Sequence, residues 1–408
     1  MKKVVLAAYA CSPHMGSEEN LGWNWATGLA QKGYEVWCVT STMGQHNIEA
    51  LGSNLDIENL HFNYVALPFG LNRLLLNPRS KRIYLHYLIW RWMAAKVVQR
   101  MHKKHLFEVA HHVTYGSMQQ GSCLYKVQDC KLIFGPVGGG QMAMPIFKEY
   151  FEKKWIWERV RKKVSDILMR YSSSLQKTLK QATTILTANQ ETKVLLGNYY
   201  PMFLQKTHMA TDIALPREYE DNIKPNKSKD GVLKILWLGT LIPRKGLKLS
   251  LEALSQVHTK VRYELTIVGD GEQEQKIDQW VKAFGLDPAY INRVGTIPFD
   301  QLKEYYIAAD VLLFCSLRDT TGSQIIEAMA FGVPVIVFNS SGAAYVVPDD
   351  CGIKINPVTK EQSINDMARA IEKMANTELR LKLGNNAYKN AMNYSWDKKI
   401  DAITKKFY

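Results

Sequence analysis

The chain has 408 residues, of which 46% are hydrophobic and 11% aromatic, and it carries a formal net charge of +14 at pH 7. This length allows two or three domains, and this composition excludes a disordered protein. No stretch approaches the roughly 20 apolar residues of a membrane-spanning helix, so no membrane span is predicted.

The positive charge is concentrated in the first half of the chain. Residues 1–200 hold 25 Lys and Arg against 13 Asp and Glu, whereas residues 201–408 hold 27 against 25. Between Asn59 and Phe107 there are nine Lys or Arg and no Asp or Glu. A field of this sign favours an anionic partner, and it leaves open a nucleic acid, a membrane surface or a phosphate-bearing substrate.

The first residues, MKKVVLAAYAC, imitate a signal peptide, but their apolar run of about eight residues is at the short end for one. We favour a buried strand at residues 4–8, because a Gly-containing loop and a helix at Asn20–Leu29 follow it. Tyr34–Thr40 is the next predicted strand, which gives a β-α-β start and a parallel sheet. The cysteines have no metal-binding or C-x-x-C spacing and predict a reducing compartment; they are Cys11, Cys38, Cys123, Cys130, Cys315 and Cys351.

The loop between this strand and this helix contains Gly16 and Ser17. Ligands of parallel sheets bind at the carboxyl ends of the strands, so these two residues could offer backbone N–H groups to a phosphate or a sugar. The alternative is that Ser17 or Asn20 only caps the helix.

Residues 79–105 predict a long helix in which Tyr and Trp alternate with Arg and Lys. Such a helix suits a membrane interface, but it is equally compatible with a surface helix whose aromatic side chains enter the core. A second basic segment with two tryptophans, Lys148–Arg170, slightly favours the membrane interpretation.

A strand at Glu108–His111 ends in the pair His111 and His112. The strand end suits polar chemistry, but no Asp, Glu or Cys stands at ligand spacing, so no metal is predicted there. The glycine-rich loop at residues 135–140 allows either a close approach to a ligand or simple flexibility.

A polar segment at Asn222–Asp230 predicts a domain boundary, and a second doubly wound sheet follows it to about residue 360. Its central stretch is Leu312–Val337, a strand, a loop and a helix that begins at Gly322 and Ser323. The helix start can bind phosphate, and the carboxylate of Glu327 can accept hydrogen bonds from a ribose diol. The alternative is an ordinary strand–helix–strand unit.

Several motifs in order make the whole chain resemble the GT4 family of glycosyltransferases. They are GSEE from Gly16, LGTLIPRKG from Leu238, IVGDGEQ from Ile267, the strand-end histidines, and RDTTGSQIIEAMAFGVPVI around Asp319. The resemblance implies an α/β protein of the GT-B type, with two Rossmann-like doubly wound domains that face a central cleft. It also implies an acceptor-binding domain at residues 1–210, a nucleotide-sugar-binding domain at 211–390, and a C-terminal helix at 391–408 that packs back on the first domain.

The resemblance further implies a retaining transfer of a sugar from a UDP- or GDP-sugar, with no cofactor and no metal. The implied catalytic residues are His112, His111, Lys245 and Asp319. The implied donor-binding residues are Gly16, Ser17, Arg244, Lys245, Gly269, Asp270, Asp319, Thr321, Gly322, Ser323 and Glu327. Lys245 and the helix start would stabilise the negative charge of the departing nucleoside diphosphate.

Two positions depart from the family pattern. The family's acidic pair is E-x7-E, whereas here Asp319 precedes Glu327; the family usually has Arg where this chain has Thr240. Either Arg244 supplies the missing positive charge, or the site uses one cation fewer.

The resulting hypothesis is a cytoplasmic enzyme, peripheral on the inner face of the membrane, that extends a lipid-linked glycan in cell-surface polysaccharide biosynthesis. Alternatives are a transferase for a soluble protein or metabolite, and an inactive nucleotide-sugar-binding protein. An anionic membrane surface is a further expected partner, and nucleic acid is not, because no recognition module is visible. The sequence leaves the oligomeric state, the donor sugar and the acceptor open.

Overall fold

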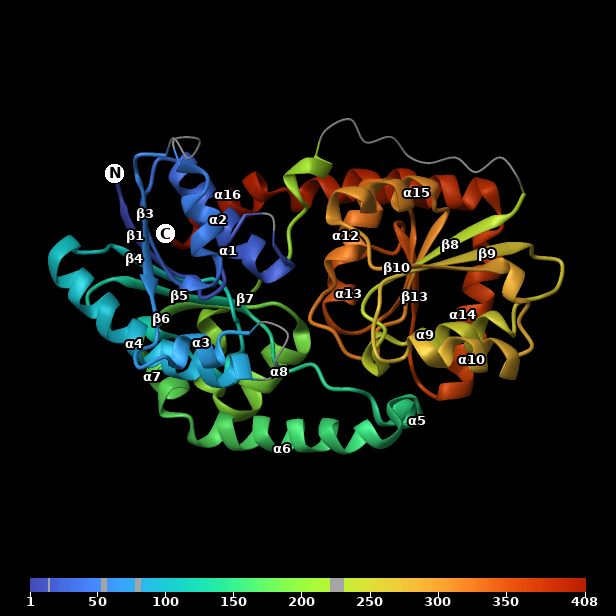
Figure 1. Ribbon diagram of the computed structural model, residues 1–408, viewed down its shortest axis with the longest axis horizontal. Coiled ribbons are helices and arrows are strands. Elements are labelled where there is room, and N and C mark those ends of the chain that lie inside the picture. The colour runs from blue at the N-terminus through green and yellow to red at the C-terminus, as the bar shows by residue number, and fades with distance from the viewer. Residues whose placement is uncertain (14, 53–56, 78–81, 221–230) are drawn as a thin grey trace. The chain divides into compact units, whose positions relative to one another are not determined.

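The computed structural model describes residues 1–13, 15–52, 57–77, 82–220 and 231–408 (Figure 1). The chain forms two compact units. Unit 1 comprises residues 1–140, 163–212 and 396–408, and unit 2 comprises residues 141–162 and 213–395. The predicted boundary segment 222–230 lies outside the described residues.

Unit 1 contains a parallel sheet of seven strands in the order β3-β2-β1-β4-β5-β6-β7. The strands are β1 (Lys3–Ala7), β2 (Glu35–Ser41), β3 (Leu60–Val65), β4 (Val109–His112), β5 (Lys131–Val137), β6 (Ala182–Thr187) and β7 (Thr207–Met209). The helices of this unit are α1 (Ser17–Gln31), α2 (Gln45–Glu49), α3 (Leu71–Leu75), α4 (Arg82–His105), α7 (Ser173–Gln181), α8 (Gln190–Tyr199) and α16 (Trp396–Phe407). The first strand is buried from Val4 onward, as expected for a parallel sheet that is covered on both faces.

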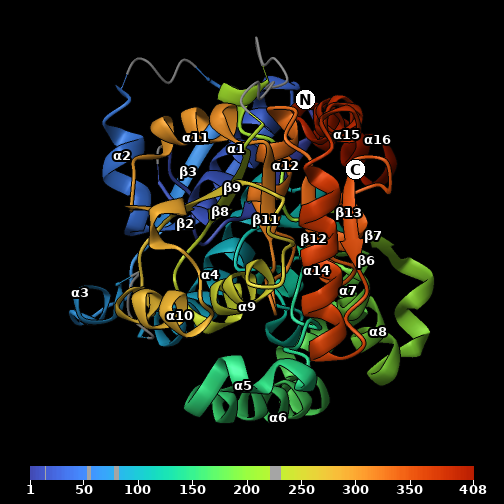
Figure 2. The same cartoon turned by 90° about the vertical axis from the view of Figure 1, so that its right-hand side faces the viewer.

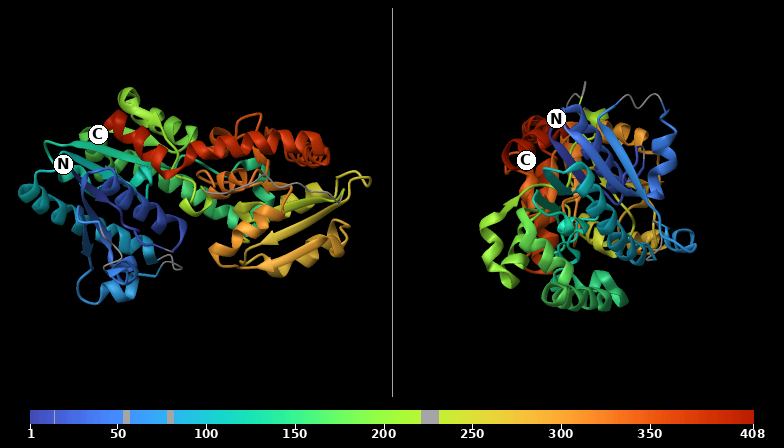
Figure 3. Two further views of the ribbon diagram at one scale, coloured as in Figure 1. Left: turned by 90° about the horizontal axis from the view of Figure 1, so that it is seen from above. Right: turned by 90° about the vertical axis from the view of Figure 1, so that its left-hand side faces the viewer.

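The C-terminal helix α16 returns to unit 1, as the sequence predicted. Trp396 packs edge-to-face against Trp25 of α1 with ring centroids 6.1 Å apart, and Lys32 pairs with Asp401 at 2.7 Å. Both termini therefore belong to the same unit, and they lie near each other in both views of Figure 3.

Unit 2 contains a parallel sheet of six strands in the order β10-β9-β8-β11-β12-β13. The strands are β8 (Leu233–Leu238), β9 (Tyr263–Val268), β10 (Ile291–Gly295), β11 (Val311–Phe314), β12 (Val335–Phe338) and β13 (Gly352–Ile355). The helices are α5 (Lys148–Phe151), α9 (Leu247–Leu254), α10 (Ile277–Ala283), α11 (Leu302–Ala308), α12 (Ser323–Ala330), α13 (Ser341–Val346), α14 (Lys360–Met374) and α15 (Thr377–Ala391).

Alternate residues of these strands enter two separate cores, because successive side chains of a strand point to opposite faces. Ile235 and Trp237 of β8 pack with helices α9, α10 and α14, whereas Leu236 packs with α12 and α15. Helices therefore cover both faces of the sheet, as Figure 2 shows for α9, α10 and α14 on one side and α11 and α12 on the other. This arrangement is the predicted doubly wound architecture.

The segment at residues 141–162 belongs to unit 2, whereas the sequence had placed it in the first domain. Phe147, Tyr150 and Phe151 are buried in the unit 2 core, and Tyr150 donates a hydrogen bond to Glu252 at 2.7 Å. The segment continues into α6 (Trp155–Tyr171), which begins in unit 2 and ends in unit 1. None of the described helices is long and apolar enough to cross a membrane.

Candidate functional site

The candidate site of unit 2 lies where the strand order of its sheet reverses, between β8 and β11. Open parallel sheets bind ligands at such a point, beyond the carboxyl ends of the two strands. The loops that follow these strands are residues 239–246 and 315–322. They are joined by the carbonyl oxygen of Arg244, which accepts a hydrogen bond from Leu317 N at 2.7 Å and lies 3.1 Å from Ser316 Oγ.

Gly246 makes this junction sterically feasible. Its φ of +76° is in the left-handed region, and a Cβ atom there would overlap the carbonyl oxygen of Cys315. Only glycine allows both the turn and this close approach of the two loops. The backbone therefore fixes where Arg244 and Lys245, just before this glycine, present their side chains.

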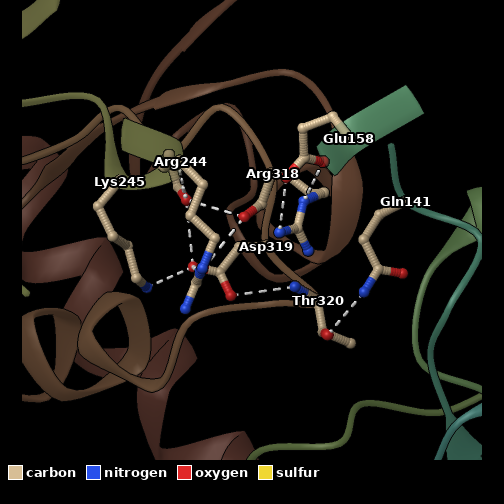
Figure 4. Close-up of polar contacts among 8 residues, drawn as sticks. Gln141, Glu158, Arg244, Lys245, Arg318, Asp319 and Thr320 are labelled. Carbon is tan, nitrogen blue, oxygen red and sulfur yellow. Dashed lines mark hydrogen bonds and ion pairs between the residues drawn. The ribbon is translucent and has the colours of Figure 1, made fainter. Parts of the chain in front are cut away.

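The carboxylate of Asp319 is the centre of a charged cluster at this junction (Figure 4). Asp319 Oδ2 forms an ion pair with Lys245 and lies 3.5 Å from Arg244 Nη1. Ser316 Oγ donates to the same oxygen at 3.2 Å, and Thr320 N donates to Oδ1 at 3.1 Å. Every partner in this cluster is a donor or a cation, so the carboxylate is held in one orientation.

The ionisation of the cluster follows from burial and charge together. Burial alone would raise the pKa of Asp319, but the charges of Lys245 and Arg244 outweigh it and hold that pKa below its usual value. Burial lowers the pKa of Lys245, and the nearby Asp319 charge opposes this shift. Near neutral pH we therefore expect a charged pair.

A second ion pair flanks the cluster and comes from the segment at residues 141–162. Arg318 Nε lies 2.9 Å from Glu158 Oε2, and Arg318 Nη2 donates to Glu158 Oε1 at 3.1 Å. Gln141 Nε2 donates to Thr320 Oγ1 at 2.9 Å. Glu158, Arg318 and Gln141 were not predicted from the sequence, because contacts across 160 or more residues leave no spacing signal.

The charges of the site favour an anion. The three cations Arg244, Lys245 and Arg318 face the two carboxylates Asp319 and Glu158, which leaves an excess of one positive charge. The start of α12 follows Asp319 by four residues and adds unpaired N–H groups and a positive dipole end. This combination suits a phosphate or diphosphate group.

Glu327 lies one turn inside α12 and is 4% exposed. Its Oε2 accepts a hydrogen bond of 2.7 Å from the hydroxyl of Tyr306, a residue of α11 that is fully buried. Burial raises the pKa of Glu327, against hydrogen bonds from Tyr306 and Ser323 that lower it. Tyr306 is a fourth residue of the site that was not predicted from the sequence.

The other predicted donor-binding residues of unit 2 lie in the loops of this junction and in the neighbouring loop after β9. Thr321 is buried at 1% exposure, and Gly322 begins the helix with a φ of +97°. Asp270 O accepts a hydrogen bond from Leu241 N at 2.6 Å, and Gly269 approaches the carbonyl of Gly239, so the IVGDG loop supports the loop after β8. A small pocket adjoins the cluster and is lined by Phe314, Ser316, Asp319, Thr321, Phe338, Ser340, Ser341 and Ala343.

The position that the family usually fills with Arg carries an exposed Thr240, and Arg244 lies against Asp319 instead. Of the two alternatives left open by the sequence, this placement favours the one in which Arg244 supplies the positive charge. Its donor-binding role stays a prediction.

In unit 1, His111 is held by two hydrogen bonds inside the core. Its Nε2 lies 2.7 Å from the carbonyl oxygen of Gly135, and its Nδ1 lies 2.7 Å from the hydroxyl of Tyr408. Because a carbonyl only accepts, Nε2 carries the proton and Nδ1 accepts from Tyr408. Burial lowers the pKa of His111 to about 3. Both ring nitrogens already have hydrogen-bond partners within unit 1, which argues against His111 as the residue that polarises the sugar.

His112 points to the other face of β4 and is 2% exposed. Burial lowers its pKa to about 4, against a small raising effect of the Tyr115 backbone, so the ring is neutral near pH 7. Its ring nitrogens make no hydrogen bond of good geometry within the described structure. His112 therefore lacks the two short hydrogen bonds that hold the ring of His111, although the Tyr115 backbone acts on its pKa.

Gly16 and Ser17 are exposed where the loop after β1 meets α1, and the N-cap position of the helix is Gly16, which has no side chain to cap it. The next residue, Glu18, accepts a hydrogen bond from the backbone N–H of Tyr115, which follows β4. Strands β1 and β4 flank the reversal of strand order in this sheet, so the loops meet at the expected ligand edge. Burial raises the pKa of Glu18 to about 7, with smaller contributions from neighbouring carboxylates.

Among the described residues, no group of three or more His, Cys, Asp or Glu side chains is arranged to hold a metal ion.

Unit 2 matches a known family of enzymes. Residues 218–390 match the family model of glycosyl transferases group 1. Unit 2 is therefore a domain of this glycosyltransferase family, and the two doubly wound units give the chain the GT-B fold.

The relatives carry glycosyltransferase names. An uncharacterized glycosyltransferase of Methanocaldococcus jannaschii is 26% identical over 42% of this chain and 46% of its own length. The sulfoquinovosyl transferase SQD2 of Arabidopsis thaliana is 27% identical over 38% of this chain and 30% of its own length. The O-antigen chain mannosyltransferase B of Escherichia coli is 32% identical over 30% of this chain and 32% of its own length. The chain thus spans less than half the length of these curated relatives.

Solved structures cover nearly the whole chain and show the fold. The sucrose-phosphate synthase of Thermosynechococcus elongatus has a TM-score of 0.66 at 17% identity, covering 100% of this chain and 98% of that one. A glycosyltransferase of Rickettsia africae has a TM-score of 0.64 at 15% identity, and the match covers 100% of this chain and 97% of that chain. HepE of Anabaena, solved with UDP-glucose, has a TM-score of 0.59 at 14% identity, and the match covers 100% of this chain and 99% of that chain.

Proposed function

We propose that the protein is a retaining glycosyltransferase that transfers a sugar from a UDP- or GDP-sugar to an acceptor hydroxyl. The observation that carries this proposal is the charged cluster at the reversal point of the unit 2 sheet, where Arg244 and Lys245 lie against Asp319 and Arg318 pairs with Glu158 beside them. The glycosyltransferase family match of this unit and the HepE complexes with UDP and UDP-glucose support the same chemistry.

The transfer breaks the bond between the anomeric carbon and the diphosphate oxygen, and it forms a bond from the acceptor oxygen to that carbon. The acceptor proton is released with the nucleoside diphosphate. Negative charge builds on the diphosphate as it departs, and Lys245, Arg244 and the start of α12 stabilise it. Glu327 accepts hydrogen bonds from the ribose hydroxyls, and no metal or cofactor takes part.

Unit 1 binds the acceptor in this proposal, and Gly16 and Ser17, in the loop after β1, stay predicted donor-binding residues. The acceptor is a lipid-linked glycan of a cell-surface polysaccharide, and the enzyme works peripherally at the cytoplasmic face of the membrane. This choice is supported by relatives named for O-antigen and undecaprenol-linked glycans. The structure of WaaG, a glycosyltransferase involved in lipopolysaccharide biosynthesis, shares the fold with a TM-score of 0.61.

A panel of UDP- and GDP-sugars tested by thermal shift identifies the donor. A ligand at 100 times its dissociation constant stabilises the folded state by about 2.7 kcal/mol, which is a measurable shift in Tm. Lys245→Ala should abolish the shift and the transfer or hydrolysis of that donor. The matched control is Lys248→Ala, which removes a lysine three residues along the chain that makes no contact with Asp319.

The outcomes separate the parts of the proposal. If no nucleotide sugar shifts the Tm, the donor class is wrong. If a donor binds but neither transfer nor hydrolysis occurs with any glycan acceptor, the protein is a nucleotide-sugar-binding protein and not an enzyme. If Lys245→Ala and Lys248→Ala behave alike, the donor does not use this cluster.

A further inference from the structure

Helix α4 of unit 1 has one face in the core and one face of large apolar side chains in solvent. Tyr87 and Trp90 are buried and contact Tyr9, each with ring centroids 5.0 Å away. His86 is also buried, and its Nδ1 lies 2.7 Å from the Tyr9 hydroxyl. These contacts fix the helix, so its opposite face is held outward. The sequence left open whether the aromatic residues enter the core; some do and others do not.

The outward face carries Tyr84, Leu85, Leu88 and Trp92, which are 60%, 52%, 43% and 59% exposed. Spacings of three and four residues place them on one side of the helix. A single exposed apolar residue is ordinary, but four large ones on one helix face mark an interaction surface.

The preceding segment extends this surface. Helix α3 contacts the start of α4 through Asn72 Oδ1, which lies 3.0 Å from His86 Nε2. Leu74 of α3 is 59% exposed, and Phe69 just before it is 97% exposed. Phe69 also has a φ of +53°, a left-handed conformation that is unfavourable for a phenylalanine. We call these six residues, from Phe69 to Trp92, the α3–α4 surface.

Cations and no acids accompany the α3–α4 surface. Arg73, Lys96 and Arg100 are exposed along the same two helices, and Lys96 Nζ lies 3.5 Å from the centre of the Trp92 ring. No Asp or Glu occurs between Asn59 and Phe107. Apolar side chains with Tyr, Trp and basic residues around them match the boundary between acyl chains and anionic headgroups.

We propose that the α3–α4 surface docks on an anionic lipid bilayer. A second copy of the chain fits less well, because a two-fold interface would place this basic surface against itself. A nucleic acid fits less well, because bulky residues such as Leu85 and Leu88 gain nothing from phosphodiesters. The proposal rests on the peripheral membrane location in the proposed function and names the surface responsible, but its test needs no donor, acceptor or activity.

Flotation of the full-length protein with vesicles tests the docking. We expect binding to vesicles of phosphatidylcholine with 30 mol% phosphatidylglycerol and little binding to pure phosphatidylcholine. Each basic residue near such a surface contributes about fivefold in partition, so R73Q/K96Q/R100Q should bind about 100-fold more weakly. Leu85→Ser with Leu88→Ser should weaken binding at high salt, where the charges are screened.

Two control variants make the result specific. K260Q/K303Q/K382Q removes the same charge from exposed positions of unit 2 and should leave binding unchanged. Ile156→Ser with Val160→Ser alters another exposed apolar row, on α6, and should also leave binding unchanged. Thermal unfolding and the nucleotide-sugar shift of every variant report whether the fold and the donor site are intact.

Absence of binding to the anionic vesicles overturns the proposal, and so does equal loss in the unit 2 control, which would indicate net charge alone. Loss that follows the α6 variant and not the α3–α4 variants also overturns it, as does a dimer in solution that the Leu85 and Leu88 variant dissociates. Each of these outcomes leaves the proposed transferase activity untouched, because donor binding is measured separately.

Discussion

The hydroxyl group of Tyr306 allows a test of the donor site by removal of a single atom. Tyr306→Phe keeps the ring in its buried position, where it stacks on Phe331 with centroids 5.5 Å apart. The variant loses only the hydrogen bond of 2.7 Å to Glu327. Because Glu327 is 4% exposed, water does not readily replace the missing donor.

The expected magnitude follows from the charge of the acceptor. A hydrogen bond to an ionised group contributes about 1.5–3 kcal/mol, and removal of one partner leaves the buried carboxylate under-satisfied. The free energy of unfolding should fall by about this amount. If Glu327 binds the ribose diol, the KM for the nucleotide sugar should rise roughly 10- to 150-fold, with a smaller change in kcat.

The pH dependence separates a positioning role from a general loss of stability. The Tyr306 hydrogen bond lowers the pKa of Glu327 against the effect of burial, so its removal raises that pKa further. The acid limb of kcat/KM should therefore move to higher pH in Tyr306→Phe. Steady-state kinetics from pH 5 to 8, at a temperature well below the Tm of both proteins, measures this shift.

Tyr219→Phe is the matched control. Tyr219 is a buried neighbour of Tyr306, but its hydroxyl donates to the carbonyl of Phe299 at 3.4 Å and does not bond Glu327. It should lose some stability without a change in KM or in the acid limb. An unchanged KM and an unmoved acid limb in Tyr306→Phe would show that Glu327 does not need this hydroxyl to bind the donor, and the reasoning would fail.

Three further predictions concern a turn and an ion pair of unit 2 and a buried histidine of unit 1. Gly246→Ala should destabilise the protein by more than about 1 kcal/mol in urea unfolding, because alanine is strained at this left-handed φ and its Cβ would overlap the carbonyl oxygen of Cys315. Gly285→Ala has the same φ strain without an overlap, so it should cost less. Glu158→Gln should lower the Tm, because it leaves the charge of Arg318 without its partner, and an unchanged Tm would show that the pair is not stabilising. His111 has a folded pKa of about 3 and an unfolded value near 6.5, so its contribution to stability is full above pH 6.5 and is lost as the pH falls toward 3, by about 4–5 kcal/mol in all. Urea unfolding at pH 7, 5 and 4 should show this loss in the native protein and a weaker one in His111→Gln, and equal slopes would contradict it.

The sequence predicted the sheets of both units and the loops at the carboxyl ends of β8 and β11, because these depend on local patterns. Runs of Val, Ile and Leu define the strands, and parallel strands bring their carboxyl ends to one edge. Lys245, Asp319 and Glu327 fall at that edge as the motifs implied. The predicted helix at residues 79–105 is found at Arg82–His105, and residues 79–81 lie outside the described structure.

The partners of these residues were not predictable from local patterns. Glu158 and Gln141 reach the site from a segment 160 or more residues earlier, and no local pattern indicates that this segment leaves the first domain. The Nδ1 atom of His111 accepts a hydrogen bond from Tyr408, which is 297 residues away in the sequence. A strand-end histidine looks the same in a sequence whether a distant hydroxyl occupies its nitrogen or a substrate does.

The two departures from the family pattern, Asp319 and Thr240, are consistent with one rearrangement of charge. An aspartate is one methylene shorter than a glutamate, and its carboxylate stays against its own loop, where Thr320 N and Ser316 Oγ donate to it. A carboxylate in that position attracts cations from the loop after β8, and both Arg244 and Lys245 lie against it. An arginine at position 240 would then duplicate a charge that Arg244 already provides, and the residue found there is an exposed threonine. The loop after β8 thus presents two cations, Arg244 and Lys245, to the aspartate that replaces the family's usual glutamate.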